Sequence, residues 1–355
     1  MFPFSEGSSS PFSEIESQSN PVSMTISRSG TLMAVSLGNT ITVVQCKLGL
    51  LGHSTDSCTR SSVFTPPTSY TLLGSFVQIV DKTVQDPLRI ITVALSPRGE
   101  SAICVFSSQS VVPTMYPISG RVTCAAAVPS RRLDSAATVV GTGSGSVVFL
   151  SVTGMTLSEV QAGEPVIGIT CDTHFVFVLL ASSVVVFNLV PPPNSRPVDI
   201  VQLPSSLDNP RFIVRPVSRS ADQYSSPPPS PKMAPVGSLF VASETCMCQI
   251  SLETKRIVTE PIVPDTDGRT TQVLFGPFDN GPVISMSDSG QLIGWESGTV
   301  VRVSSRIKME GMVCTAVSPA RDFPRLWTLR SEKGGMVLTS LWLRAGATKD
   351  RHTCI

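Results

Sequence analysis

Short apolar segments recur along the whole chain, and turns of small or polar residues separate them. Two clear examples are residues 26–35 (ISRSGTLMAV) and 283–296 (VISMSDSGQLIGWE), where a turn containing Ser-Gly joins two apolar segments. Apolar runs of about four to eight residues bounded by turn residues are typical of buried strands. No longer stretch carries the 3.6-residue period of an amphipathic helix. The pattern therefore predicts an all-β chain.

The apolar segments fall into seven units, which begin near residues 23, 90, 122, 166, 212, 271 and 312. Neighbouring segments inside several units are separated by only a few residues, and such short connections require antiparallel hairpins. Repeats built only from strands are typical of a β-propeller. We therefore predict a single seven-bladed β-propeller over residues 21–347. Six or eight blades would fit the same pattern, because the second and fifth units are irregular.

Four segments depart from the repeating pattern. Residues 1–20 are rich in serine and poor in apolar residues, so we predict a disordered tail. Residues 52–68 are interpreted as a polar insert. Residues 191–235 contain two Pro-Pro-Pro runs, and because proline donates no ladder hydrogen bond we predict a long loop insert within the fifth blade. Residues 348–355 are expected to form a C-terminal tail.

The composition supports a large β core and gives no sign of a nucleic-acid partner. Apolar residues make up 41% of the chain and charged residues 15%, while aromatic residues account for only 6%. The core is therefore expected to consist mainly of Val, Leu, Ile and Ala. Of these, the β-branched residues Val and Ile suit strands best. The formal net charge of +1 creates no global field that would attract nucleic acid.

Cysteine usage and the N-terminal sequence predict a cytoplasmic protein. Most of the nine cysteines lie inside apolar runs, as Cys104 and Cys314 do, where a free thiol behaves as a small buried hydrophobe. The N-terminus lacks the basic and apolar regions of a secretory signal, which favours a reducing compartment. The most apolar stretch, 175–190, is too short for a transmembrane helix. We predict two strands there, joined at residues 181–183, and no transmembrane segment.

The segment 26–35 resembles the inner strand, turn and second strand of a WD40 repeat, and so does 94–100 (ALSPRGE). Residues 283–296 are similar to the stretch of that family in which a strand ends in Trp and an acidic residue, here Trp295-Glu296. The Gly-His dipeptide of the family is missing from the expected places, and three histidines cannot supply its histidine–aspartate network in every blade. The resemblance implies a divergent WD40-like β-propeller.

Two motifs that could indicate cofactor or metal binding are better explained by a structural role of their residues. Residues 141–146 (GTGSGS) precede the apolar strand 147–150, whereas a phosphate-binding loop would need a following helix. We predict a hairpin turn there. Cys246 and Cys248 are separated by one residue and have no second pair, so we predict a structural role instead of a zinc site.

The sequence predicts no catalytic residue, and we expect a protein that is not an enzyme. A hydrolytic site needs a base that reaches a nucleophile. His53, His174 and His352 are the only histidines, and none lies in a recognisable nucleophile motif. No catalytic, metal-binding or cofactor-binding residue and no cofactor is therefore assigned.

Two pairs of residues are candidates for regulation or lipid binding. Arg131-Arg132 is a distant match to the Phe/Leu-Arg-Arg-Gly motif of the phosphoinositide-binding propellers of autophagy, and a solvated turn is the alternative interpretation. Ser226 and Ser230 each precede proline, so proline-directed kinases could phosphorylate them. Each phosphate would add about −1.5 to −2 charges. The same loop could instead offer a polyproline II ligand.

Together these features predict a non-catalytic protein–protein interaction scaffold within a multiprotein assembly. A closed ring of blades leaves its faces and loops free to bind other proteins. The alternative is a phosphoinositide-binding propeller that acts at intracellular membranes through peripheral contact, as in autophagy.

Overall fold

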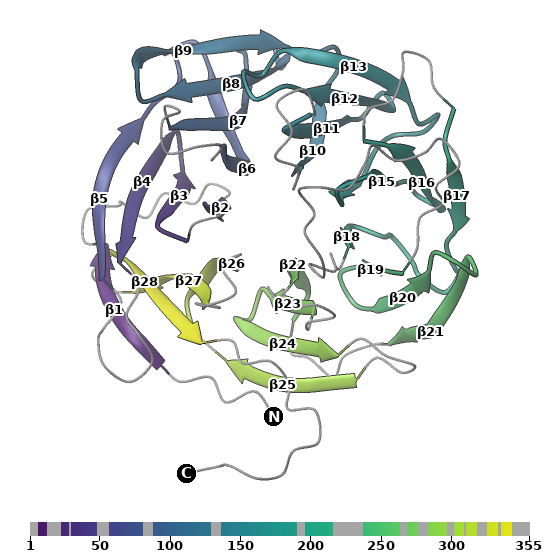
Figure 1. The fold of residues 1–355 in the computed structure, drawn as a ribbon. Helices are drawn as coiled ribbons and strands as arrows, with labels where there is room; N and C mark the ends of the chain where they lie inside the picture. Colours follow the sequence, from purple (N-terminus) through teal and green to yellow (C-terminus); the bar gives the residue numbers. More distant parts are fainter. Residues whose placement is uncertain are drawn as a thin grey trace.

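In the computed structural model the described residues form strands, turns and connections, and no helix. The described residues are 6–12, 23–27, 30–47, 57–80, 88–128, 136–189, 196–215, 237–262, 268–275, 283–296, 302–308, 310–317, 325–332 and 335–342. Their strands form seven antiparallel sheets of four strands each, arranged in a ring (Figure 1). The chain is therefore a seven-bladed β-propeller, which confirms the predicted fold class and blade count.

Blades are numbered in chain order, and the strands of each blade follow one another from the axis to the rim (Figure 1). The first two blades contain β2 (Ser23–Ile26), β3 (Leu32–Leu37), β4 (Thr40–Lys47), β5 (Ser57–Phe64), β6 (Thr71–Val80), β7 (Arg89–Leu95), β8 (Ser101–Ser107) and β9 (Ser110–Pro117). The next two contain β10 (Val122–Ala127), β11 (Thr138–Thr142), β12 (Ser146–Leu150), β13 (Thr156–Gln161), β14 (Gly168–Cys171), β15 (Phe175–Leu179), β16 (Ser183–Asn188) and β17 (Asp199–Gln202).

The fifth and sixth blades contain β18 (Phe212–Val214), β19 (Ser238–Ala242), β20 (Met247–Ser251), β21 (Arg256–Ile262), β22 (Thr270–Phe275), β23 (Val283–Ser287), β24 (Gln291–Glu296) and β25 (Arg302–Lys308). The seventh blade combines both ends of the described chain in β26 (Met312–Val317), β27 (Arg325–Glu332), β28 (Gly335–Trp342) and β1 (Glu6–Phe12).

The ring is closed by β1, which forms the outer strand of the seventh blade. It pairs antiparallel with β28, so that Ser10 lies opposite Leu338 and Phe12 opposite Met336. The prediction of a disordered tail over residues 1–20 is therefore wrong for residues 6–12. An outer strand is held mainly by backbone hydrogen bonds, which serine and glycine can make as well as apolar residues can.

The outermost strands are also where the other differences from the predicted pattern lie. β5 occupies part of the predicted polar insert 52–68, and β17 lies within the predicted loop insert 191–235. The inner strand β18 lies within the same bounds, at residues 212–214, where the fifth apolar unit was predicted to begin. Of that insert, residues 190–195 and 216–236 lie outside the described residues, as does the predicted tail 348–355.

The predicted inner strands agree closely with the structure, with one difference in their position. The apolar segment 175–190 forms the hairpin of β15 and β16, as predicted. The turn 96–100 joins β7 to β8, the second and third strands of its blade, instead of joining the inner strand to the second. No helix among the described residues is long and apolar enough to cross a membrane.

The core consists of seven apolar clusters, one between each pair of neighbouring blades. β15 shows why its sequence is apolar at every position. Phe175, Phe177 and Leu179 pack toward the fifth blade, whereas Val176 and Val178 pack toward the third. Because side chains alternate between the faces of a strand, burial on both faces requires a continuous apolar run.

Two glutamine side chains, Gln78 buried and Gln272 half-buried, add polar links between blades. The Gln78 side-chain amide donates to the Ala137 carbonyl oxygen at 3.0 Å, and its oxygen accepts from the Thr138 hydroxyl at 2.7 Å. Gln272 donates to the Thr315 carbonyl oxygen at 2.8 Å and accepts from the Thr315 amide at 3.1 Å. Each glutamine uses both its donor and its acceptor, as polar groups withdrawn from water commonly do.

Replacing Gly141 by alanine is expected to destabilise the protein. The third and fourth blades approach closely there, since an added Cβ would overlap Val166 Cγ1 and lie 2.8 Å from Cys124 Sγ. We expect a loss of about 1–3 kcal/mol in the free energy of unfolding, measured by urea denaturation. Gly143→Ala is the matched control, because its Cβ would come no closer than 3.7 Å to a neighbour. Equal stability of the two variants would contradict this packing.

Deleting residues 1–12 is expected to lower the free energy of unfolding by an amount on the order of 3 kcal/mol, because each backbone hydrogen bond contributes about 1 kcal/mol. The deletion removes β1 and exposes the edge of β28. Thermal unfolding followed by circular dichroism measures the loss. Deleting only residues 1–5 keeps β1 and serves as the control. If the protein lacking residues 1–12 kept the melting temperature of the full-length protein, β1 would not be needed to close the ring.

Candidate functional site

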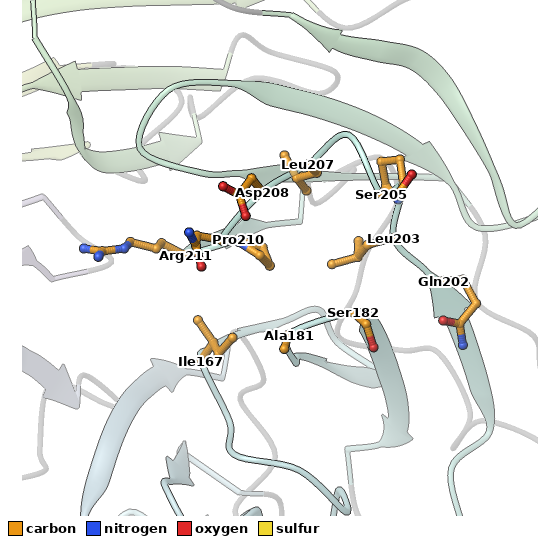
Figure 2. A pocket seen from close by; sticks show the side chains of 12 residues that line it. Ile167, Ala181, Ser182, Gln202, Leu203, Ser205, Leu207, Asp208, Pro210 and Arg211 are labelled. Carbon is orange, nitrogen blue, oxygen red and sulfur yellow. The ribbon is translucent and has the colours of Figure 1, made fainter.

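A pocket of about 590 Å³ lies on the face that carries the turns between the second and third strands of each blade, here called the turn face. The pocket is enclosed between the turn Ala181–Ser182 and the connection 203–211, which leads from β17 to β18 (Figure 2). Its volume lies within the range of about 300–1,000 Å³ that is typical of ligand pockets.

The pocket combines apolar and polar side chains. Ile167, Leu203 and Pro210 contribute apolar surface, and Figure 2 shows the Leu203 side chain pointing toward Pro210. Ser182 and Asp208 are exposed and bring polar groups to the opening. This arrangement suits an apolar group that enters the pocket while polar groups around it fix the orientation.

The connection that forms one wall of the pocket is held in place by local contacts. The Leu203 amide donates to the Ser182 carbonyl oxygen at 2.9 Å, and the Leu207 amide donates to the Pro204 carbonyl oxygen at 3.0 Å. Leu207 is buried in the cluster between the fourth and fifth blades. Asn209 has a φ of 47°, in the left-handed region that asparagine tolerates better than most residues. The pocket wall is therefore preformed.

Charged side chains extend from the pocket along the turn face. Glu244 accepts from Arg211 and, at 3.3 Å, from Arg269. The side chains of Arg211 and Arg269 are 59% and 73% exposed, so these ion pairs contribute little to stability. They do, however, leave charged hydrogen-bonding groups on the surface beside the pocket.

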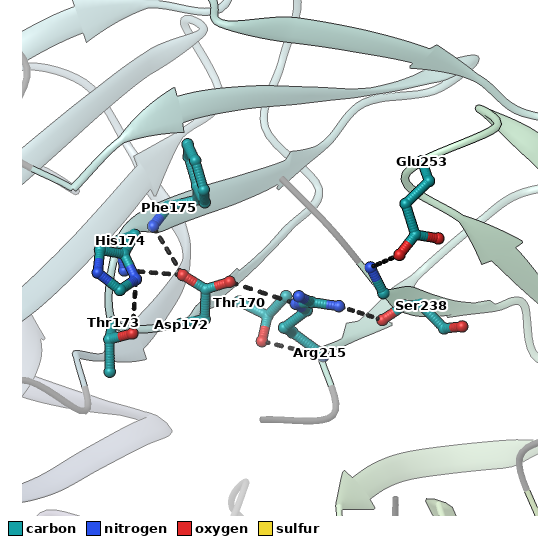
Figure 3. A network of polar contacts seen from close by, with 9 residues as sticks. Thr170, Asp172, Thr173, His174, Phe175, Arg215, Ser238 and Glu253 are labelled. Carbon is teal, nitrogen blue, oxygen red and sulfur yellow. Dashed lines mark hydrogen bonds and ion pairs between the residues drawn. The ribbon is translucent and has the colours of Figure 1, made fainter. Parts of the chain in front are cut away.

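The opposite face carries a more buried polar network centred on Asp172 (Figure 3). One carboxylate oxygen accepts from the amides of His174 and Phe175 at 2.8 and 2.7 Å, and the other accepts from Arg215 Nε at 3.3 Å. The side chains of Asp172 and Arg215 are only 12% and 10% exposed. The carboxylate therefore fixes the turn into β15 and joins the fourth blade to the fifth.

Arg215 also joins the two ends of the connection between β18 and β19. Its guanidinium donates to the Ser238 carbonyl oxygen at 2.8 Å and lies 5.3 Å from the centre of the Phe177 ring. At the second end, the Gly237 amide donates to Glu253 Oε1 at 2.9 Å. These groups hold two blades and the two ends of one connection together, so we interpret the network as structural and not as a catalytic site.

The predicted structural role of Cys246 and Cys248 is consistent with their burial in the cluster between the fourth and fifth blades. Burial raises the pKa of the Cys104, Cys248 and Cys314 thiols to about 12. Such thiols remain protonated near neutral pH and are poor nucleophiles.

The other sequence motifs give no catalytic site among the described residues. The GTGSGS motif forms the hairpin turn between β11 and β12, as predicted. His174 Nδ1 is hydrogen-bonded to the Thr173 hydroxyl at 2.8 Å, while His53 and His352 lie outside the described residues. Within the described part of the chain, no group of three His, Cys, Asp or Glu side chains is placed to hold a metal ion.

The remaining candidates lie outside the described residues and stay predictions. Arg131 and Arg132 belong to the connection between β10 and β11, and Ser226 and Ser230 belong to the connection between β18 and β19. The sequence reasoning missed the pocket, because residues distant in sequence line it. Asp172 did carry a local signal, since an aspartate just before a strand can accept from amides two and three residues ahead.

The Asp172–Arg215 contact is expected to couple the two blades energetically. Asp172→Asn keeps a side-chain oxygen for the turn but removes the charge that faces Arg215, so we expect a loss of about 1–3 kcal/mol. Arg215→Met and the double variant complete a double-mutant cycle measured by urea denaturation. Asp208→Asn, an exposed carboxylate on the turn face, is the control. Additive effects of the two substitutions would exclude the coupling.

The buried thiols are also expected to make the protein less stable in alkali. The folded-state pKa of Cys104 is about 12 against an ordinary value of 9.0, so the unfolded chain loses this proton at a lower pH than the folded chain. The stabilisation is therefore complete below about pH 9 and declines as the pH rises toward about 12. Urea denaturation from about pH 8 to 10.5 should show a shallower decline for Cys104→Ala than for the wild type. Identical slopes would contradict the raised pKa.

Comparisons with known proteins support the fold and leave the family open. No family model matches the sequence, and no curated protein matches it. A crystal structure of Raptor from Chaetomium thermophilum superposes with a TM-score of 0.63 at 13% identity over 93% of this chain, which spans 28% of the Raptor chain. BBS1N, solved in complex with ARL6DN, gives a TM-score of 0.60 at 12% identity over 97% of this chain and 98% of its own.

At these low identities the two similarities concern the fold alone. Both structures match nearly the whole of this chain, so the similarity extends over the ring and not over a few blades. The β-propeller fold that the resemblance of residues 26–35 implies is confirmed by the ring of seven sheets. The chain is a seven-bladed β-propeller that is similar in fold to both structures.

Proposed function

We propose that this protein is a non-catalytic scaffold that binds a segment of a partner protein in the turn-face pocket. The observation that carries the proposal is the pocket itself, which is preformed and combines apolar walls with a polar opening. A segment of a partner chain would insert an apolar side chain between Leu203 and Pro210. Its backbone would find hydrogen-bonding groups at Ser182 and Asp208.

The rigidity of the pocket supports binding without chemistry. Its wall is tied to Ser182 and anchored in the core by Leu207, so little conformational entropy would be lost when a partner binds. A small number of buried anchor groups commonly supplies most of the energy of a protein interface. A pocket of this size is large enough for such an anchor.

The charged groups next to the pocket extend the surface available to a partner. Arg211 belongs both to the pocket lining and to the contacts with Glu244, so the pocket and the charged surface are continuous. Arginine is enriched at protein interfaces, and polar groups at the margin of an interface favour specificity. BBS1N, which has a similar fold, was solved in complex with another protein.

Ala181→Arg is expected to abolish partner binding, because it places a long charged side chain at the exposed turn that borders the pocket. Tagged wild type and variant would be purified from the same lysate, and the proteins recovered would be quantified by mass spectrometry. We expect recovery of specific partners to fall by about tenfold or more, as for loss of an interface anchor.

Ala127→Arg provides the matched control, since Ala127 is exposed at the end of β10 on the opposite face. It should leave the recovered set of partners unchanged, and both variants should keep the wild-type melting temperature. Partners that bind both variants equally well would show that the pocket is not the binding site.

A further inference from the structure

Two cysteines lie directly opposite each other on neighbouring strands of the first blade. β4 and β5 pair antiparallel, and the register places Cys46 opposite Cys58, between the pairs Gln45–Thr59 and Lys47–Ser57. Among the described strand pairs, no other two cysteines are placed opposite each other. Opposite residues in an antiparallel pair lie on the same face of the sheet.

The backbone hydrogen bonds identify which kind of pair this is. The Cys46 amide donates to the Thr31 carbonyl oxygen at 2.7 Å, on the side of β4 that faces β3. The amide and carbonyl of one strand residue point to the same side, so those of Cys46 point away from β5. Cys46 and Cys58 therefore form a non-hydrogen-bonded pair, in which opposite Cα atoms are about 4.5 Å apart.

That spacing is compatible with a disulfide. Disulfide-linked residues usually have Cα atoms about 4.4–6.8 Å apart, and opposite Cβ atoms come closest in non-hydrogen-bonded pairs. The register and the spacing typical of such a pair therefore suit a bond between residues 46 and 58. No rearrangement of the sheet is needed.

The position of this pair in the ring gives the bond a consequence. The Cys46 side chain is 2% exposed and belongs to the apolar cluster between the first and seventh blades, together with Trp327 and Leu338. β5 also contacts β1, the strand that closes the ring (Figure 1). A covalent link between β4 and β5 would fix the outer part of the first blade beside this closure.

We infer that Cys46 and Cys58 form a reversible disulfide that stabilises the ring where it closes. With oxidised glutathione as the oxidant, one cysteine thiolate attacks the glutathione disulfide and releases one reduced glutathione. The second cysteine thiolate attacks the resulting mixed disulfide at the protein sulfur and releases another. Two protein thiols are oxidised to one disulfide, and one glutathione disulfide is reduced to two thiols, which carry the two protons.

Because Cys46 is buried, the reaction requires local opening of the blade. β5 is the outer strand of its blade and, among the described strands, pairs on one side only; such elements open at lower free energy than the core does. The disulfide should therefore form slowly in the folded protein and then prevent β5 from separating from β4.

The test uses the full-length protein, incubated in buffers with an increasing ratio of oxidised to reduced glutathione. Intact-mass measurement should show loss of two hydrogens, and peptide mapping without reduction should recover Cys46 linked to Cys58. The oxidised protein should melt at a higher temperature than the reduced protein, and reduction should reverse the shift. Cys58→Ala should lose both the cross-link and the shift.

Controls separate this pair from the other cysteines. Cys248→Ala removes a buried thiol elsewhere in the ring and should leave the cross-link between residues 46 and 58 intact. Cys46→Ala repeats the test from the other strand if Cys58→Ala folds poorly. Glutathione adducts without a cross-link, a disulfide between other cysteines, or no change in mass under fully oxidising conditions would each overturn the inference.

Discussion

Burial of apolar side chains between neighbouring blades is the interaction on which the rest of the structure depends. Each of the seven apolar clusters joins two blades, so no blade has a core of its own. A single four-stranded sheet would expose both of its faces, and it becomes stable only when other sheets cover it. Ring closure is thus a condition for burying the first and last blades.

The same constraint determines how much of the fold the sequence could predict. The second and third strands of a blade are covered on both sides, as in β11, β12, β15 and β16, and continuous apolar runs such as FVFVL in β15 identified them almost to the residue. Outer strands such as β1 (EGSSSPF) and β25 (RVSSRIK) lie at the rim and are held through backbone hydrogen bonds. Their sequences carry no alternation, so an outer strand resembles a polar loop.

The candidate site was less predictable than the fold for a related reason. The pocket is created when the connection 203–211 folds back over the turn Ala181–Ser182, and neither segment carries a recognisable motif. The ion pair of Asp172 and Arg215 joins residues from two blades, so its existence follows from the ring geometry. By contrast, the hairpin role of the GTGSGS motif was predictable, because the residues that follow it locally form a strand.

The pairing of β1 with β28 also affects how the chain can fold during synthesis. The residues of β1 leave the ribosome before every other described strand, yet their partner strand is among the last described residues to be made. Throughout translation β1 therefore has no partner, and the faces of the first blade that belong against the seventh stay uncovered. Exposed strand edges and apolar faces promote aggregation of incomplete chains. A nascent chain of this architecture thus benefits from chaperone protection until the last blade is complete.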